Sequence, residues 1–440
     1  MESAIKEVLL KIEKNSAKGD IYISRSEENE AAADEGEIER IKSAVSAGAG
    51  IRVFKGGRMG FSYTTDLTGE GLAKAASAAL DSAFIEGYEG YFPAGFSQPA
   101  SVMTEGGGHD KITNETRKNT VLEFEAAVKK SEKSVRHVRD AVFKDVITSV
   151  YFADTSGGAY KYKKTFYSVM ASAVASEGEN TEVADVYSQS CSFDALNTAE
   201  TAAAAGCRAA ALLGGGPVAT GRYNLIFPDY TGCDIAWLLS RIFHAGNIAK
   251  GKSLLSNLVI GDKTASKEFS LRDDALLGLH AGSFPFDAEG TPGANKVLID
   301  RGTYSGFISD RIYAASLGAA PSGNSVRQDF KSMPEPGPSN FYIAGSRENP
   351  EEFLKNASGL YVNSLMGLHT ADPVSGNFSL GINGWILEKG NRVKSVKECL
   401  ITGNIKDILE RTIKTCGEPV FYGGTGAPVI YTEGIMLAGT

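Results

Sequence analysis

The first residues of the chain repeat apolar side chains at helical spacing. Positions i, i+3, i+4 and i+7 are apolar, which predicts a short helix with one apolar stripe made of Ile5, Val8, Leu9 and Ile12. Apolar and polar residues then alternate over 20–24, which predicts a strand. We therefore expect the chain to begin with a helix followed by a strand.

Residues 51–63 carry the pattern of a β-hairpin. Alternating apolar residues flank the sequence KGGR at 55–58, whose two glycines favour a tight turn. One face of such a hairpin must be covered. The segment 72–83 has apolar residues at helical spacing, and its many alanines permit close approach to a sheet. We therefore expect a helix over 72–83 to pack on the hairpin.

Periodic segments continue up to residue 216. Their spacing and their β-branched content predict helices over 119–134 and 195–213 and strands over 142–155 and 166–176. Residues 88–108 contain two prolines and a glycine triplet and are expected to form a loop.

A cluster of glycines and a proline follows the last of these helices. The sequence GGGP at 214–217 is a strong helix stop signal, because glycine caps helix ends and proline cannot continue a helix. We place the main domain boundary there. The predicted domains are 1–216 and 217–440.

Strand and turn patterns dominate the second domain. The predicted elements are a strand over 223–227, a buried helix over 233–244, and strands over 376–396 and 428–437. Asn383-Gly384 and the sequence KGN at 389–391 both have hairpin-turn chemistry. The predicted class is α+β, with an N-terminal α/β-type domain of hairpin and covering helices and a C-terminal, mostly antiparallel β domain.

Composition and charge narrow the function. The chain has 440 residues, 42% of them apolar, which is enough to bury more than one core. The formal charge of −8 disfavours direct nucleic-acid binding, because phosphate binding needs clustered lysines and arginines. No stretch reaches 18 apolar residues, and charges interrupt the N-terminus where a secretion signal would be apolar. We therefore expect a cytoplasmic protein with neither membrane nor nucleic acid among its direct partners.

The sequence lacks the motifs of several common hydrolases. A zinc site of the HExxxH type needs two imidazoles on one helix face and a carboxylate beside the metal-bound water. The chain has no HExxxH, and its histidines are too far apart to form such a pair: His109, His137, His244, His280 and His369. It also has no GxSxG nucleophile elbow and no CxxC among its five cysteines.

Two stretches, 48–67 (GAGIRVFKGGRMGFSYTTDL) and 370–409, resemble the most distinctive segments of the TldD/PmbA family. One member of that family carries HExxxH and the other, PmbA or TldE, does not, so this chain is more similar to PmbA/TldE. The resemblance implies a two-domain α+β protein that pairs with a TldD-like metallopeptidase subunit and processes or degrades unfolded peptides between the subunits. The family is also described as a candidate modulator of DNA gyrase.

The resemblance indicates where the zinc motif would lie. Aligning 223–255 with the strand and helix of the peptidase member places HExxxH over residues 236–241, which read AWLLSR here. None of them is a histidine, and Arg241 would repel a divalent cation. We therefore expect no metal and no cofactor in this chain, and zinc only in a TldD-like partner.

Four residues are the candidates for catalysis. Cys416 lies in a TCG sequence similar to that of the peptidase member's metal-binding cysteine, but a lone thiolate holds zinc poorly, and a small buried residue is the alternative. His244 follows the 236–241 window and otherwise acts as a helix cap or dipole partner. Asp287 and Glu289 would share a face on a strand, as an acid–base pair or cation site, but PFDAEGTPG also fits a surface loop.

Two other functions fit the sequence. One is a non-catalytic regulatory binding protein that acts on the DNA gyrase or toxin–antidote pathway. The other is a stand-alone hydrolase that uses either Asp287 and Glu289 or a site with His244 and Cys416. Gyrase binding without peptide cleavage would indicate the first, and turnover by the isolated chain would indicate the second. Without a partner we expect a homodimer, because a surface built for a related subunit can accept a copy of the same chain.

Overall fold

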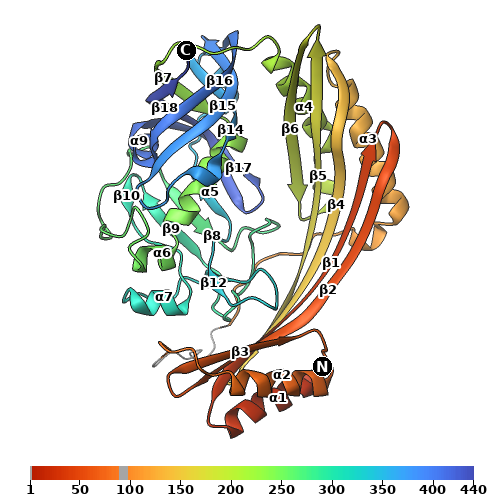
Figure 1. The fold of residues 1–440 in the computed structure, drawn as a ribbon, viewed down its shortest axis with the longest axis vertical. Helices are drawn as coiled ribbons and strands as arrows, with labels where there is room; N and C mark the ends of the chain where they lie inside the picture. The colour runs from red at the N-terminus through yellow and green to blue at the C-terminus, as the bar shows by residue number, and fades with distance from the viewer. Residues whose placement is uncertain (1, 89–97) are drawn as a thin grey trace.

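The described chain forms two large β-sheets that stand side by side, with helices packed on each, and a separate two-stranded pair (Figure 1). The computed structural model describes residues 2–88 and 98–440, so the loop predicted over 88–108 lies partly outside the described residues. One sheet is built from residues before 216 and the other from residues after it. The α+β class predicted from the sequence is confirmed.

Six antiparallel strands form the N-terminal sheet, in the order β3-β2-β1-β4-β5-β6. Several are long, and β4 has 20 residues. Their bounds are β1 (Lys18–Asp34), β2 (Glu37–Lys55), β3 (Arg58–Thr64), β4 (Val135–Asp154), β5 (Ala159–Glu177) and β6 (Asn180–Ser190). The hairpin predicted over 51–63 is the pairing of β2 with β3.

Helices cover this sheet at its two ends. Near the N-terminus lie α1 (Glu2–Lys14) and α2 (Gly69–Asp81), and at the far end lie α3 (Asn114–Lys130) and α4 (Thr198–Leu212) (Figure 1). The apolar stripe predicted for the first helix is confirmed, since its buried residues are Ile5, Val8 and Ile12. All four helices match predicted segments in type and approximate position.

The C-terminal half contains a ten-stranded mixed sheet. Its main path runs β10-β9-β8-β13-β18-β16-β15-β14-β7, and β17 pairs with β18. The bounds are β7 (Gly221–Phe227), β8 (Leu271–Asp274), β9 (Asn295–Asp300), β10 (Thr303–Tyr304), β13 (Phe341–Ile343), β14 (Gly359–Met366), β15 (Asn377–Glu388), β16 (Asn391–Asn404), β17 (Thr412–Tyr422) and β18 (Thr425–Ala438). Two pairings, β13 with β18 and β14 with β7, are parallel, and the others are antiparallel.

The remaining elements complete the described chain. They are the helices α5 (Asp229–Ile242), α6 (Ala245–Ala249), α7 (Arg311–Ser316), α8 (Pro350–Leu354) and α9 (Ile405–Arg411), the 3-10 turns η1 (His109–Lys111), η2 (Phe193–Ala195) and η3 (Leu368–Thr370), and the pair β11 (Ser325–Val326) and β12 (Glu335–Pro336). None of the helices in the described ranges is long and apolar enough to cross a membrane.

One predicted turn is wrong. Asn383-Gly384 lies inside β15, at a bulge where the register with both neighbouring strands shifts, and the hairpin turns instead at 389–390. A Cβ on Gly384 would lie 1.9 Å from the Tyr361 carbonyl oxygen. The glycine therefore permits close strand contact at a bulge, which gives the same sequence signal as a turn glycine.

Candidate functional site

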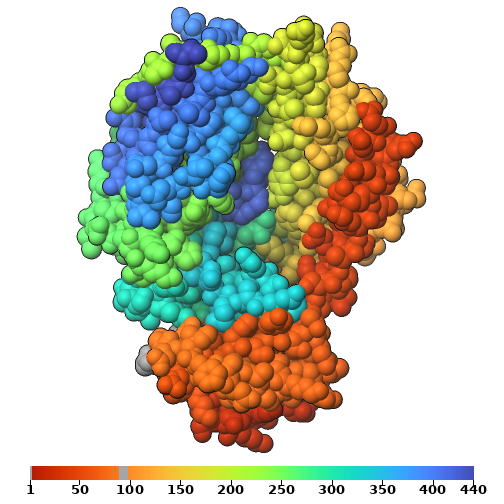
Figure 2. Space-filling view, viewed as in Figure 1, coloured from red at the N-terminus to blue at the C-terminus, as the bar shows by residue number. Residues whose placement is uncertain are grey.

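A cleft of about 960 Å³ separates the edge strand β6 from the C-terminal half. Figure 2 shows this side of the molecule hollowed between the yellow-green strands and the blue C-terminal half. The cleft is lined by the middle of β6, by α4, by one face of α5, by the end of β14 with η3, and by β15 and β17. Both halves of the chain contribute to its lining.

Strand β6 touches the C-terminal half at both of its ends. At one end Lys397 Nζ lies 2.7 Å from the Glu182 carboxylate. At the other end the Gln189 amide donates to the Gly423 carbonyl oxygen at 2.8 Å and accepts from the Gly423 N–H at 2.8 Å. The residues between these contacts, 183–187, line the cleft, so β6 spans it as a fixed wall.

Helix α5 forms the floor of the cleft. Its apolar residues Ile235, Leu238 and Leu239 are buried in the core of the C-terminal half. Tyr230, Asp234 and Trp237, at positions i, i+4 and i+7, therefore share the opposite face and line the cleft. Trp237 is 41% exposed, so its indole presents an apolar surface to the cleft.

Arg208 and the hydroxyl groups of Tyr230 and Tyr422 make specific contacts at one side of the cleft floor. The Arg208 guanidinium lies 3.5 Å from the centre of the Tyr230 ring. The Tyr230 hydroxyl donates to Asn363 Oδ1 at 3.2 Å, and the Tyr422 hydroxyl donates to Asp229 Oδ2 at 3.3 Å. Burial raises the pKa of Asp229, while Arg208 and the Tyr422 hydrogen bond oppose that rise. Arg208 is thus already engaged in the wall of the cleft.

Asp234 differs from the other charged residues of the cleft. Burial raises the pKa of its carboxyl to about 7. Within the described residues, no hydrogen bond or ion pair reaches this carboxylate. A half-buried carboxyl that titrates near neutral pH and faces a cavity is a feature of functional sites, because structural carboxylates normally gain a partner.

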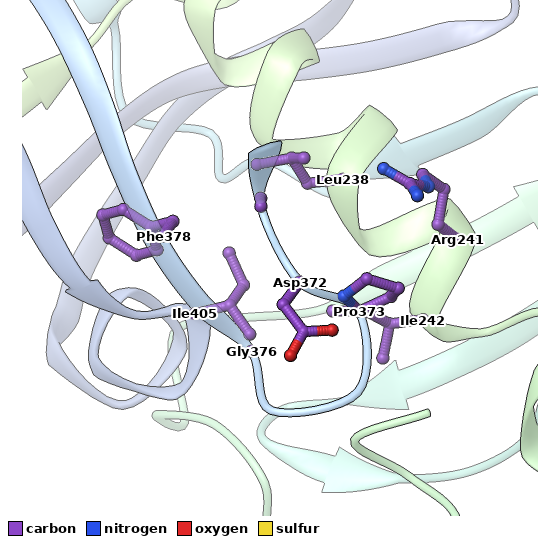
Figure 3. Close-up of a pocket in the computed structure, with 9 residues that line it drawn as sticks. Leu238, Arg241, Ile242, Asp372, Pro373, Gly376, Phe378 and Ile405 are labelled. Atoms are coloured by element: carbon purple, nitrogen blue, oxygen red, sulfur yellow. The ribbon is translucent and has the colours of Figure 1, made fainter. Parts of the chain in front are cut away.

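The residues that stand where the zinc motif was predicted do not fit a metal. Ala236 is fully buried, Trp237 faces the cleft, and the Arg241 guanidinium lies 5.6 Å from the Trp237 ring centre. Next to this face of the helix, Leu238, Arg241 and Ile242 border a small pocket of about 10 Å³ closed by the loop at Asp372 (Figure 3). Such a pocket has room for about one water molecule. The window offers neither an imidazole nor a carboxylate to zinc.

Cys416 lies on β17 and is 1% exposed. It packs with Ile226, Ala357 and Val429 in an apolar cluster separate from the one that holds α5. Burial raises the pKa of its thiol to about 11. The uncharged thiol is a poor metal ligand, because metal binding requires the thiolate.

His244 lies just after α5 and caps the next helix. Its Nδ1 accepts a hydrogen bond from the Gly246 N–H at 3.1 Å, at the start of α6. Burial lowers the pKa of this imidazole, so the neutral form that can accept is favoured. This geometry agrees with the helix-cap role predicted from the sequence as the alternative to a catalytic role for His244. A different histidine, His369, lines the cleft.

The strand predicted as one setting for Asp287 and Glu289 is wrong, and the predicted turn lies in the interior rather than at the surface. The two carboxylates lie in a buried turn, neither on a strand nor in a surface loop. Asp287 accepts from the backbone N–H groups of Ser325, Glu289 and Thr291, at 2.9 to 3.0 Å. The turn glycine and proline suggested the surface, but partners distant in the sequence bury the segment.

Glu289 instead joins the two halves of the chain. Its Oε1 lies 2.8 Å from Arg52 Nη1, and its Oε2 accepts from the Arg311 N–H at 2.9 Å. Arg52 in turn lies 2.6 Å from Asp20 on the neighbouring strand. These bonds engage both Glu289 oxygens in structural contacts, so the residue is poorly suited to proton transfer with a substrate.

Away from the cleft, three side chains lie close enough together to bind a cation. Asp34, Glu35 and His137 bring ligand atoms within 4.8 Å of one another near the β1–β2 turn. All three are at least partly exposed, and Lys129 Nζ lies 3.1 Å from Glu35. The Lys129 ammonium already neutralises part of the negative charge of the two carboxylates, so we interpret the group as a surface ion-pair cluster.

Three family models match the chain. The PmbA/TldA metallopeptidase C-terminal domain matches residues 220–439, metallopeptidase domain 1 matches 19–83, and the metallopeptidase central domain matches 108–213. Together they cover both sheets and every element that lines the cleft.

Individual proteins resemble the chain over nearly its whole length. A metalloprotease from Methanothermobacter thermautotrophicus is 25% identical, with 98% of each chain covered. A candidate modulator of a DNA gyrase from Thermotoga maritima has a similar solved structure, with a TM-score of 0.92, 22% identity, and coverage of 99% of this chain and 100% of the other. TldE from Thermococcus kodakarensis has a TM-score of 0.87, 20% identity and the same coverage. At these identities the two structures show a shared fold.

Proposed function

Since the chain belongs to the TldD/PmbA family of metallopeptidase-related proteins, we propose that it is the PmbA/TldE-like, metal-free subunit of a TldD/TldE-type peptidase complex. Such a complex would process or degrade unfolded peptides. The zinc and the hydrolytic centre would lie in a TldD-like partner, and this chain would supply part of the enclosure and of the peptide-binding surface.

The observation that carries this proposal is the cleft face of α5. The helix lies on the floor of the cleft between the two halves of the chain and presents Tyr230, Asp234 and Trp237 there, together with Thr231 and Cys233. A zinc hydrolase needs three protein ligands and an open position for water. The cleft also holds Asp185, Cys233 and His369, but in the described part of the chain no three of its possible ligands come within 4.8 Å of one another. An aromatic, partly apolar cleft suits extended peptides instead.

The stand-alone hydrolase has less support. Asp287 and Glu289 are held by backbone and arginine donors, His244 caps a helix, and Cys416 is buried in a separate apolar cluster. General acid–base chemistry needs a group within reach of a substrate proton. None of these four groups lines the cleft.

Co-expression tests the proposal. The chain would be produced alone and together with a TldD-like protein that carries HExxxH, and each preparation would be assayed for cleavage of an unfolded peptide and for zinc by elemental analysis. We expect co-purification, cleavage by the pair only, and zinc in proportion to the partner. The control is a partner whose HExxxH glutamate is replaced by glutamine, which should still bind this chain but not cleave.

Two results would overturn the proposal. Stoichiometric zinc together with cleavage by the isolated chain would assign the hydrolytic centre to it. Failure of the two proteins to associate, combined with stable binding of this chain to DNA gyrase, would favour the regulatory binding role instead.

A further inference from the structure

The cleft contains one charged group that the rest of the fold leaves without a counterpart. Arg208 stacks on Tyr230, and Asp185 accepts a hydrogen bond from the Ser172 hydroxyl at 2.6 Å. Asp234 has no such partner among the described residues. A half-buried carboxylate without a cation is destabilising, because its desolvation is not offset by hydrogen bonds. The unmatched charge therefore points to a ligand that supplies the cation.

Large apolar side chains line the cleft together with this carboxylate. Met170 from β5, Trp237 from α5 and Met366 from β14 line the same cleft and are 44%, 41% and 50% exposed. Methionine and tryptophan adapt to varied apolar partners, and an aromatic face also attracts a cation. The site therefore suits an alkyl chain that ends in a positive charge.

The walls of the cleft offer backbone groups to an extended chain. Strand β6 pairs with β5 alone, so within the described residues its outer edge faces the cleft without a paired strand. On the far wall, β14 pairs with β7 only at 360–361, and its residues 363–366 line the cleft beyond that point. An extended peptide can add to such an edge through main-chain hydrogen bonds, while pockets select its side chains.

We propose that the cleft of this chain binds an extended, unfolded peptide and seats a lysine or arginine side chain of that peptide against Asp234, beside Trp237. This inference rests on the proposed function only for the class of ligand, an unfolded peptide. Its new content is a basic-residue subsite in the subunit that lacks the zinc motif, with Asp234 as the residue that determines specificity.

Other ionisable groups near Asp234 could also contribute to the pH dependence of peptide binding. They are Asp229 and Cys233 on α5, Arg208 on α4, Asp185 and Tyr187 on β6, Tyr230 on α5, His369 on η3 and Tyr422 on β17. Burial raises the pKa of the Asp234 carboxyl to about 7, so the carboxylate that attracts a basic residue forms as pH rises through that value. His369 lines the same cleft, so it needs its own control.

Peptide binding to the isolated chain tests the inference. Three unstructured decapeptides of glycine, serine and leucine would differ only in one central residue, which is lysine, glutamine or glutamate. Isothermal titration at pH 8 should give a dissociation constant at least about tenfold lower for the lysine peptide than for the glutamine peptide, as expected for one charge-assisted contact. The glutamate peptide should bind most weakly. At pH 5.5 the ratio of the dissociation constants of the glutamine and lysine peptides should fall towards one.

Substitutions show which residue causes the preference for the lysine peptide. Asp234→Asn should abolish the lysine preference at both pH values while leaving the affinity for the glutamine peptide within about twofold, a change of less than half a kcal/mol. Asp81→Asn removes one exposed negative charge from α2, away from the cleft, and His369→Gln removes the neighbouring imidazole. Both should retain the preference. Tryptophan fluorescence in a Trp385→Phe background should report binding through Trp237, the other tryptophan of the chain.

The outcomes separate this inference from the proposed function. Equal binding of all three peptides, no binding at all, or a lysine preference that survives Asp234→Asn would overturn the basic-residue subsite, even if the chain still assembles with a zinc-bearing partner. A lysine preference lost in Asp234→Asn, in a chain that binds no such partner, would support the subsite and overturn the proposed function.

Discussion

The Arg52 guanidinium lies 2.8 Å from the Glu289 carboxylate and connects the two halves of the chain across 237 positions of sequence. Both side chains are buried, at 0% and 1% exposure, and Asp20 completes the cluster 2.6 Å from Arg52. The pair fixes the N-terminal sheet to the turn that follows Phe286. The geometry of the cleft therefore depends on a buried electrostatic contact outside it.

Glu289→Gln should destabilise the protein strongly. The substitution leaves the Arg52 charge short of one counter-ion, and breaking a buried pair in this way costs about 3 to 5 kcal/mol. Urea unfolding followed by circular dichroism would measure the loss. The matched control is Glu86→Gln, which removes an exposed partner 3.2 Å from Arg58 and should change stability by less than about 1 kcal/mol. Similar losses in the two variants would contradict the structural role of the buried pair.

Asp310 gives a pH-dependent prediction with a defined sign. Burial, with Glu289 and Asp287 nearby, raises the pKa of its carboxyl in the folded protein to about 7, above the unfolded value of about 3.9. The folded state thus holds a proton that the unfolded state releases. The contribution of Asp310 to the free energy of unfolding is fully present below pH about 4 and is lost as pH rises through about 7.

Asp310→Asn should remove this dependence and keep the local structure. The Asp310 side chain caps α7 by accepting from the Tyr313 N–H at 2.8 Å, and asparagine caps helices equally well. As pH rises from 5 to 8, the unfolding free energy of the variant should therefore increase by about 3 kcal/mol relative to that of the unmodified chain.

Asp372 supplies the control for that measurement. Bonds from Ser375 and from the Val374 N–H lower the pKa of this exposed carboxyl, so its stability contribution is lost only as pH falls below the ordinary range of aspartate. Asp372→Asn should therefore show no change relative to the unmodified chain between pH 5 and 8. If the two variants respond alike, the raised pKa of Asp310 is contradicted.

Alkylation should distinguish the thiols of Cys207 and Cys416. Cys207 is exposed, whereas Cys416 is buried and the pKa of its thiol is raised to about 11. Because the thiolate is the reacting form, Cys416 should react with iodoacetamide at pH 8 on the order of 100-fold more slowly, as read by peptide mass spectrometry. Comparable rates would show an accessible thiolate and would renew its candidacy as a metal ligand.

The sequence predicted local structure better than long-range structure. Helical spacing around Ile12 and Leu72 and alternation around Val53 led to α1, α2 and the β2–β3 hairpin, because burial of one face leaves a periodic pattern. The outer part of β1 was missed, since the run EENE at 27–30 has no apolar alternation. Its pairing with β2 and β4 on both sides holds it as strand regardless.

The candidate site depended on partners that no local pattern reveals. Asp287 and Glu289 were seen as a pair, but their burial follows from Arg52 and Ser325, which lie far away in sequence. Asp234 could have been found: it is a single acidic residue within GCDIAWLL, an otherwise apolar segment of a predicted buried helix. A charge in such a position needs either a partner or a function.

Gly60 tests how closely α2 must approach the hairpin. A Cβ at this position would lie 2.0 Å from the Ala79 carbonyl oxygen and 2.8 Å from the Ala83 nitrogen. Both contacts are with backbone, which cannot move aside as a flexible side chain can. Gly60→Ala should therefore force α2 away from β3 and cost about 1 to 3 kcal/mol, the usual penalty of overpacking.

Gly107→Ala is the matched control for this substitution. A Cβ at Gly107 would meet no heavy atom within 4 Å, so the same chemical change should leave stability within about 0.5 kcal/mol. Thermal unfolding of both variants by calorimetry would compare them directly. Because α2 also shares a buried cluster with α1 and the β1–β2 pair, the Gly60→Ala transition should broaden as this end of the sheet unfolds early. Equal transitions in the two variants would show that the helix can shift without loss of its packing.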